Sequence, residues 1–358
     1  MVLCGCLRLK SGENKMFKMK KLLLATGLLA MTGAANAAYE IKLTDDDVIS
    51  FGGYIKIDAR YVDGTAGYKD FWTGSATPVE DKSQFKMFAN ETRFNTKYQH
   101  GDVTGFIEMD FYGGGGNEII SNSVHPRLRH AFIKYKNVLV GQTWTTFMNT
   151  SAIPETADFA GPLVGMAFVR NTQVRYTMGG LQLSLENPES YGGDASEDSM
   201  PDVTAKYTFK GDWGNVSVAG LARQLNTLGG DSETAVGYSV AGRIKTFGKS
   251  DFRFQLHGGN TGRYVGVTAQ KDLVGEEVES SISYMAAYRH YWTEDTRSSV
   301  FYGNITTDES DADRTHWGVN IFKNFTPKLS FGAEVGQFDQ ADTNSDSFYG
   351  QLSAKYVL

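Results

Sequence analysis

The stretch YIKIDARY, residues 54–61, alternates between two chemically different faces. Its even-numbered positions carry Tyr, Lys, Asp and Arg, whereas its odd-numbered positions carry Ile, Ile, Ala and Tyr. Because successive side chains of a β-strand point to opposite sides of the sheet, this order predicts a strand with one apolar and one polar face. The alternation recurs near residues 91–98, 107–111, 252–257 and 281–289, so the unit is repeated along the chain.

The repeats are separated by breaks that alternate in length. Seven short breaks lie near residues 99–102, 136–137, 178–180, 211–214, 248–250, 293–295 and 326–328. Eight long breaks lie near residues 63–83, 113–124, 146–167, 187–201, 225–233, 260–277, 306–313 and 339–346. Together they join sixteen strands, an even number with both termini on one side, as in bacterial outer-membrane barrels. We therefore predict an all-β, 16-stranded antiparallel transmembrane β-barrel with short periplasmic turns and long external loops.

A soluble β-sandwich is the alternative fold, because its strands also alternate. Its apolar face, however, is a packed interior. Here aromatic side chains recur near strand ends on the apolar face, as an interfacial girdle of a membrane barrel requires. They include Tyr98, Tyr176, Trp292, Trp317, Phe325 and Tyr356. The aromatic positions favour the barrel.

The N-terminal region has the layout of a secretory signal peptide. Basic residues precede the apolar run 22–31, and the sequence ANA at residues 35–37 has the small-x-small pattern of a cleavage site. A membrane anchor is the alternative, but the run is shorter than the roughly 20 residues that a spanning helix needs. We predict that residues 1–37 are a presequence and cleaved signal peptide, with Met16 or Met19 as the true start. Residues 38–47 would be a short periplasmic segment, and residues 48–358 the barrel.

Cleavage would change the composition of the protein. Both cysteines, Cys4 and Cys6, fall in the removed part, so the exported chain would contain no disulfide. The whole chain has 35 basic and 41 acidic residues, and residues 1–37 hold six and one of them, so the mature charge is 29 minus 40, or −11. This acidic balance argues against a nucleic-acid-binding protein, which would present a basic face.

Basic residues accumulate on the polar face of the predicted strands, which would line the lumen. These pore-lining positions are Lys56, Arg60, Arg93, Arg175, Arg223, Arg243, Arg253 and Arg289, together with Lys97, Lys206 and Lys355. Guanidinium groups on a barrel wall attract carboxylates and phosphates and can bind them with two hydrogen bonds at a narrow point. The alternative is that these residues only hydrate a wide pore, paired with lumen acids. We expect a preference for small anions.

The third long connection, residues 146–167, is unusually apolar and rich in small residues for a loop. A loop of this composition favours burial. We expect it to fold into the lumen, where it would narrow the pore and present Glu155 and Asp158 to the basic wall. The alternative is an exposed loop that packs against a neighbouring subunit.

Two neighbouring runs carry a resemblance to a known family. RLRHAFIKY at residues 127–135, followed by VGQTWTTFM at residues 140–148, resembles the signature of DcaP-like porins. The resemblance implies a trimeric outer-membrane channel linked to uptake of dicarboxylic acids, and it makes Arg129 and Arg175 candidate substrate contacts. Some family members carry an N-terminal coiled coil, whereas here only an acidic segment at residues 42–47 precedes the first strand. Residues 127–135 do not alternate cleanly, so periodicity leaves open whether Arg129 faces the pore.

We interpret the protein as an outer-membrane porin that allows passive diffusion of small hydrophilic solutes. The expected partners are further copies of the chain in a homotrimer, outer-membrane lipid and lipopolysaccharide, and small anionic solutes, with no nucleic acid, cofactor or metal. Acidic external loops, such as residues 308–313, could hold divalent ions that bridge to lipopolysaccharide, or could be a solvated surface. Two alternatives remain, a barrel enzyme of the lipase or protease type and a non-conducting structural or adhesive barrel. The sequence contains no nucleophile-elbow, Walker or metal-ligand motif.

Overall fold

The computed structural model describes residues 39–358, so the predicted presequence and signal peptide lie outside the described residues. The strands are β1 (Tyr39–Lys42), β2 (Asp47–Ala66), β3 (Pro78–Phe88), β4 (Arg93–His100), β5 (Val103–Asp110), β6 (Arg127–Tyr135), β7 (Val138–Trp144), β8 (Arg170–Met178), β9 (Leu181–Glu186), β10 (Asp202–Gly211), β11 (Gly214–Asn226), β12 (Ser232–Lys245), β13 (Asp251–Gly259), β14 (Leu273–Val274), β15 (Glu277–Val278), β16 (Ser281–Tyr291), β17 (Thr296–Thr307), β18 (Asp313–Asn324), β19 (Leu329–Gln340) and β20 (Ser345–Val357). Short 3₁₀ helices cover η1 (Thr150–Ala152), η2 (Leu163–Gly165), η3 (Ala195–Glu197), η4 (Gly262–Tyr264) and η5 (Ala341–Thr343).

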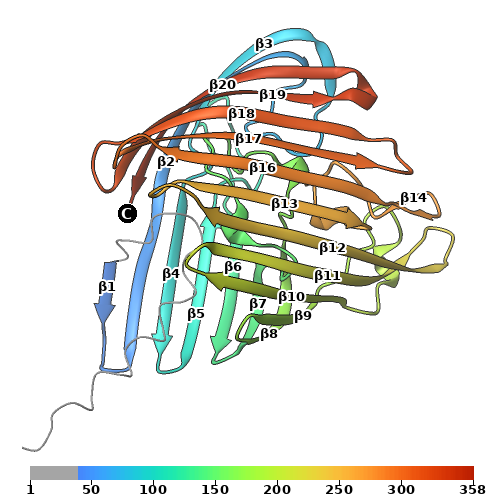
Figure 1. Ribbon diagram of the computed structural model, residues 1–358, viewed down its shortest axis with the longest axis horizontal. Helices are drawn as coiled ribbons and strands as arrows, with labels where there is room; N and C mark the ends of the chain where they lie inside the picture. Colours follow the sequence, from blue (N-terminus) through green and yellow to red (C-terminus); the bar gives the residue numbers. More distant parts are fainter. Residues whose placement is uncertain (1–38) are drawn as a thin grey trace, which may run out of the picture. The chain divides into compact units, whose positions relative to one another are not determined.

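Consecutive strands pair antiparallel around a closed barrel (Figure 1). The sheet contains 18 separate strands, but β3 and β4 lie in series along β2, whose Asp47–Tyr54 half pairs with β4 and whose Asp58–Ala66 half pairs with β3. The short β1 pairs with residues 48–51 of β2, just before the residues 54–64 that pair with β20 and close the barrel. With β3 and β4 counted as one strand and β1 set aside, the wall has the predicted sixteen strands.

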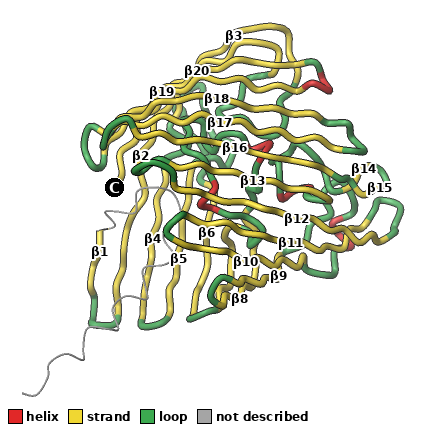
Figure 2. Tube along the Cα trace, in the orientation of Figure 1, coloured by secondary structure: helices red, strands yellow, loops and turns green. Residues whose placement is uncertain are grey.

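The two ends of the barrel differ in their connections, as the tube in Figure 2 shows. Seven short turns join strands at one end, which we call the short-turn end, and all seven fall where the sequence predicted them. The other end, the long-loop end, holds loop 1 (residues 67–77), loop 2 (111–126), loop 3 (145–169) and loop 6 (260–280). Three predicted long breaks are turns of five residues or fewer, at 227–231, 308–312 and 341–344, because the flanking strands run for 12–14 residues instead of ten.

The wall has apolar side chains outside and polar side chains inside. On β2, Ile57 is 48% exposed, whereas the adjacent Asp58 is 1% exposed. A soluble sandwich has the opposite arrangement, with apolar side chains inside. An apolar outer face is what a barrel surrounded by lipid requires. No helix within residues 39–358 is long and apolar enough to cross a membrane.

An apolar core also lies inside the barrel, where the sequence predicted only polar residues and loop 3. Loops 1, 3 and 6 contribute Trp72, Phe147 and Tyr264 to it, and the wall contributes Trp144, Phe338 and Tyr349. The loops are joined by backbone hydrogen bonds, from Gly74 to Val267 (2.6 Å) and from Phe168 to Tyr264 (3.0 Å). Loops 1 and 6 therefore share the interior with loop 3.

Candidate functional site in the barrel interior

Loop 3 leaves the wall after β7 and folds into the barrel. Its apolar side chains, including Phe147, Leu163 and Met166, are fully buried there. Folding inward removes this apolar surface from water, which is the driving force for the placement. The inward-folded third loop predicted from its composition is confirmed.

Glu155 of loop 3 binds two arginines of the barrel wall. Its carboxylate accepts hydrogen bonds from Arg297 on β17 at 2.6 Å and from Arg289 on β16 at 3.1 Å. Burial raises the pKa of Glu155, but the hydrogen bond and charge of Arg297, with a contribution from Arg289, outweigh it and lower the pKa to about 2. Glu155 is therefore ionised at neutral pH, and it neutralises part of the charge of this basic wall.

Asp158, the second acidic residue predicted for this loop, lies in a buried ion pair with Arg60. The Arg60 Nη1 atom is 3.0 Å from the carboxylate, and both side chains are fully buried. The guanidinium also lies 4.4 Å from the ring centroid of Tyr349 and 5.2 Å from that of Trp72. Arg60 therefore attaches loop 3 to β2, and its guanidinium is enclosed by protein.

Arg129 faces the interior because β6 contains a β-bulge. Glu108 pairs with His130 and Met109 pairs with Leu128, so Arg129 is the extra residue between two register positions. Both Arg129 and His130 are buried, whereas Leu128 is exposed on the outer face. The bulge explains why residues 127–135 do not alternate, and it settles the orientation that periodicity left open.

Four guanidinium groups gather beside loop 3, and we call them the arginine cluster: Arg93 on β4, Arg127 and Arg129 on β6, and Arg170 at the start of β8. The ring of Phe159, a loop 3 residue, lies 5.4 Å from Arg93, 5.8 Å from Arg127 and 5.7 Å from Arg129. Arg170 lies 4.7 Å from the ring of Trp144. Contacts with aromatic faces stabilise a guanidinium without neutralising it.

The arginine cluster has more positive than negative charge. Asp110 binds Arg127 at 2.7 Å and Arg129 at 3.0 Å, and Glu108 binds Arg129 at 2.9 Å. None of the ion pairs formed within residues 39–358 involves Arg93 or Arg170. The Nε atom of Arg93 and the Nη1 atom of Arg170 are buried and have no hydrogen-bond partner in the same part of the chain. Four guanidinium groups and two carboxylates leave a local excess of two positive charges.

Three other predicted arginines surround Asp251 near the short-turn end. Asp251 is fully buried and binds Arg243 at 2.9 Å, Arg253 at 2.6 Å and Arg289 at 2.6 Å. Arg253 also donates to the backbone oxygen of Ile153 in loop 3. These guanidinium groups therefore share a carboxylate and hold the loop.

Three more of the predicted residues, Lys56, Arg175 and Arg223, also have protein partners. Lys56 binds Glu91. Arg223 binds Asp272 and Asp202, and the side chains of all three residues are fully buried. Arg175 donates to Gln173 at 3.0 Å and to the backbone oxygen of Trp144. The structure thus brings Arg93 and Arg129 together beside loop 3. Separate contacts with other parts of the chain hold Lys56, Arg60, Arg175, Arg223, Arg243, Arg253 and Arg289.

Sequence reasoning missed Arg127, Arg170 and Arg297. Arg170 has the same parity as Thr172, whose side chain is exposed on the outer face, so alternation predicts that it faces outward. It turns inward because the chain is leaving loop 3 at this point. Arg127 precedes the bulge, which shifts the phase of its strand. Arg127 could have been identified from its position in the run of residues 127–135 that resembles the family signature.

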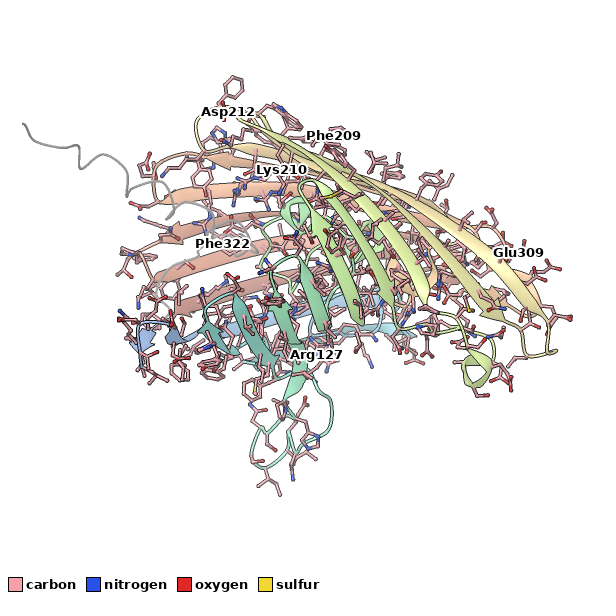
Figure 3. The ribbon with its side chains drawn as sticks, turned by 90° about the horizontal axis from the view of Figure 1, so that it is seen from below. Arg127, Phe209, Lys210, Asp212, Glu309 and Phe322 are labelled. Atoms are coloured by element: carbon pink, nitrogen blue, oxygen red, sulfur yellow. The ribbon has the colours of Figure 1, made fainter. Side chains whose placement is uncertain are left out.

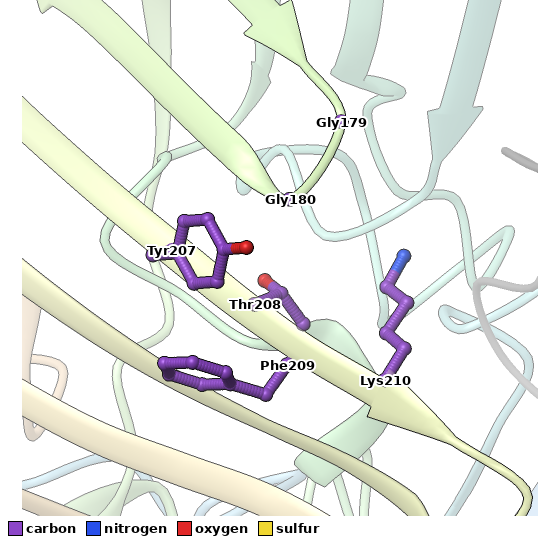
Figure 4. A pocket seen from close by; sticks show the side chains of 6 residues that line it. All are labelled: Gly179, Gly180, Tyr207, Thr208, Phe209 and Lys210. Carbon is purple, nitrogen blue, oxygen red and sulfur yellow. The ribbon is translucent and has the colours of Figure 1, made fainter.

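One hollow lies outside the interior, on the outer surface of the barrel. A hollow of about 380 Å³ at the short-turn end is lined by Gly180, Tyr207 and Phe209 among others (Figure 4). Tyr207 and Phe209 are exposed and form an edge-to-face pair with centroids 4.7 Å apart, so this hollow belongs to the outer aromatic surface. Within residues 39–358, no group of three or more His, Cys, Asp and Glu side chains is placed to hold a metal ion.

Comparison with known proteins gives a family and a fold. Residues 25–320 match the family model described as DcaP outer membrane protein. The outer membrane channel DcaP of Acinetobacter baumannii is similar in structure, with a TM-score of 0.77 and 23% identity over 90% of this chain and 100% of that one. An anion-selective porin from Comamonas acidovorans (TM-score 0.61, 10% identity, 87% and 100% covered) and OmpF of Salmonella typhi (0.58, 14%, 89% and 100%) share the fold. No curated protein sequence matches this chain.

Proposed function

The chain belongs to the DcaP outer membrane protein family and is an outer-membrane channel of the porin type, and we propose that this channel favours small anions such as dicarboxylates. The observation that carries the proposal is the pair Arg93 and Arg170, which have no carboxylate partner within residues 39–358. Unpaired guanidinium groups bind carboxylates through charge and paired hydrogen bonds. A solute with two carboxylates could contact two members of the arginine cluster at once.

In this proposal loop 3 brings the permeating ion close to the excess positive charge of the arginine cluster. It narrows the interior beside the cluster through Phe159, so a permeating ion passes close to the guanidinium groups. Arg60, Arg223 and Arg253 contribute differently, because each is held by a carboxylate. In this proposal they shape the pore, and the unpaired arginines select the ion.

Planar-bilayer recording of the purified channel tests the proposal. Under a salt gradient the reversal potential should show that anions are more permeable than cations, and added succinate should reduce the chloride current by occupying the cluster. A reversal potential of the opposite sign would contradict the anion preference. Correctly inserted protein that conducts no ions would favour the non-conducting structural barrel instead.

The channel is also proposed to assemble as a homotrimer. Strands β4 to β9 contain only six to nine residues, whereas a tilted strand needs about 9–11 to cross a bilayer. This low wall is better covered by protein than by lipid. Loop 2, which projects from the same wall near Arg127 in Figure 3, exposes Ile119 (96%) and Ile120 (85%). Native mass spectrometry of the purified channel should give three chains, and a monomer that conducts normally would contradict the assembly.

A further inference from the structure

A hollow of about 350 Å³ between loop 1 and β3 concentrates basic side chains, and we call it the lysine pocket. Lys69 and Tyr68 line it from loop 1, and Lys82, Gln84 and Lys86 line it from β3. Figure 1 shows β3 at the end of the barrel away from the turn that joins β4 to β5. The pocket is therefore at the long-loop end, far from the short turns.

The β3 side chains of the pocket point toward the interior and not toward lipid. Lys86 pairs with Arg60 across the strands, and Gln84 pairs with Val62. Directly paired residues of an antiparallel sheet lie on the same face. Since Arg60 and Val62 are buried inside the barrel, Lys86 and Gln84 also lie on the inner face. Lys82 precedes Gln84 by two residues, so its side chain lies on the same face.

The pocket retains unpaired positive charge. Lys86 is 3.4 Å from Glu118 of loop 2 and lies 5.2 Å from the ring of Tyr68. Neither Lys69 nor Lys82 takes part in an ion pair within residues 39–358. The hydroxyl group of Tyr68 is buried and has no hydrogen-bond partner in this part of the chain. The hydroxyl group also lies beside the carboxylate of Asp70, so the two ammonium groups of Lys69 and Lys82 are the groups available to an anion.

Loop 1 connects the lysine pocket to the arginine cluster. Phe71, three residues after Tyr68, has its ring centroid 4.7 Å from that of Phe159 and 5.0 Å from that of Tyr112. Phe159 is the residue around which Arg93, Arg127 and Arg129 gather. Loop 1 therefore lines the lysine pocket at Tyr68 and contacts Phe159 beside the arginine cluster at Phe71, with Asp70 between the two positions.

We propose that the lysine pocket is a capture site that binds a carboxylate of an anionic solute before the solute enters the constriction. This inference rests on the proposed anion preference and adds a second site to it. Lysine suits the task, because its ammonium group acts as a point charge that attracts an anion without holding it in a fixed geometry. The phosphate of a lipid headgroup offers similar chemistry, but the inward direction of Lys82 and Lys86 favours a solute.

The test compares Lys69→Gln/Lys82→Gln with the wild type in single-channel recordings of succinate block, in bilayers free of lipopolysaccharide. A matched control, Lys136→Gln/Lys249→Gln, removes the same charge from two lysines at the short-turn end that are 60% and 56% exposed. In about 0.1 M salt the pocket variant should bind succinate about threefold more slowly from the long-loop side, with an unchanged dissociation rate. In about 1 M salt, where the Debye length is about 3 Å, the difference should disappear.

The outcomes separate this inference from the proposed function. A wild type that is anion-selective but has the same association rate as the pocket variant overturns the capture site alone. A wild type without anion preference overturns the proposed function and the capture site with it. An effect that appears only when lipopolysaccharide is added to the bilayer would assign the lysines to lipid phosphate and would also overturn the inference.

Discussion

Replacing the two unpaired arginines, as Arg93→Gln/Arg170→Gln, should remove most of the anion preference. Gln keeps a polar side chain but carries no charge, so the local excess of the arginine cluster falls from two positive charges to none. The paired residues Arg127 and Arg129 keep their carboxylates Asp110 and Glu108. Because no ion pair is broken, the barrel should fold normally, and selectivity should change without loss of the pore.

The size of the effect follows from Coulomb's law. A unit charge about 6 Å from an ion in water contributes about 0.7 kcal/mol, and screening in 0.1 M salt reduces this to about 0.4 kcal/mol. A guanidinium attracts an anion and repels a cation equally, so two of them change the anion-to-cation permeability ratio by about tenfold. In 1 M salt the same removal should change the ratio by only about twofold.

The assay is the reversal potential in planar bilayers at both salt concentrations, with Lys136→Gln/Lys249→Gln as the control of equal charge. The control should leave the permeability ratio within about twofold of the wild type, because its charges are exposed at the short-turn end. A double variant of Arg93 and Arg170 that keeps the wild-type ratio in 0.1 M salt would refute the reasoning. So would a change of the same size at both salt concentrations, since that would indicate altered pore geometry.

Three further substitutions test the anchoring of the internal loops. Glu155→Gln should weaken the attachment of loop 3 to Arg297 by about 2–4 kcal/mol and increase open-channel noise. Because the pKa of Glu155 is lowered to about 2, this attachment is complete above a pH of about 4.5 and lost as pH falls through about 2, so wild-type noise should be constant from pH 5 to 7. Arg223→Ala should leave Asp272 buried without its partner, at a cost of about 3–5 kcal/mol, and expose loop 6 to protease with unchanged ion selectivity. Trp72→Ala should remove a fully buried ring and lower stability by about 3–5 kcal/mol, measured as a lower temperature for loss of the folded band on a gel.

The positions of the strands could be predicted from the sequence because the order of apolar and polar residues in each strand depends only on what its two faces contact. Residues 54–61 alternate since one face meets lipid and the other the interior, and no distant residue changes that requirement. The prediction was weakest where this local rule fails. In β6 the bulge places Arg129 and His130 on the same face, and at Arg170 the end of loop 3 overrides the parity of the strand.

The roles of the basic residues depended on contacts across the barrel. Arg60 and Arg93 are both inward-facing arginines of β-strands, and their sequence surroundings give no reason to separate them. In the structure Asp158, 98 positions away, neutralises Arg60, whereas Arg93 has no such partner within residues 39–358. A charge can be called unpaired only after every element that packs around it is known.

The sequence by itself therefore determined the barrel, its strand number, its short turns and the inward fold of loop 3, because alternation and loop composition are local consequences of burial in lipid or protein. Only the tertiary structure decided which arginines are free to meet a solute. It also showed that loops 1 and 6 join loop 3 inside the barrel, through contacts such as Gly74 with Val267. These features arise from ion pairs and backbone contacts between segments far apart in the chain, and such pairings leave no periodic trace in the order of residues.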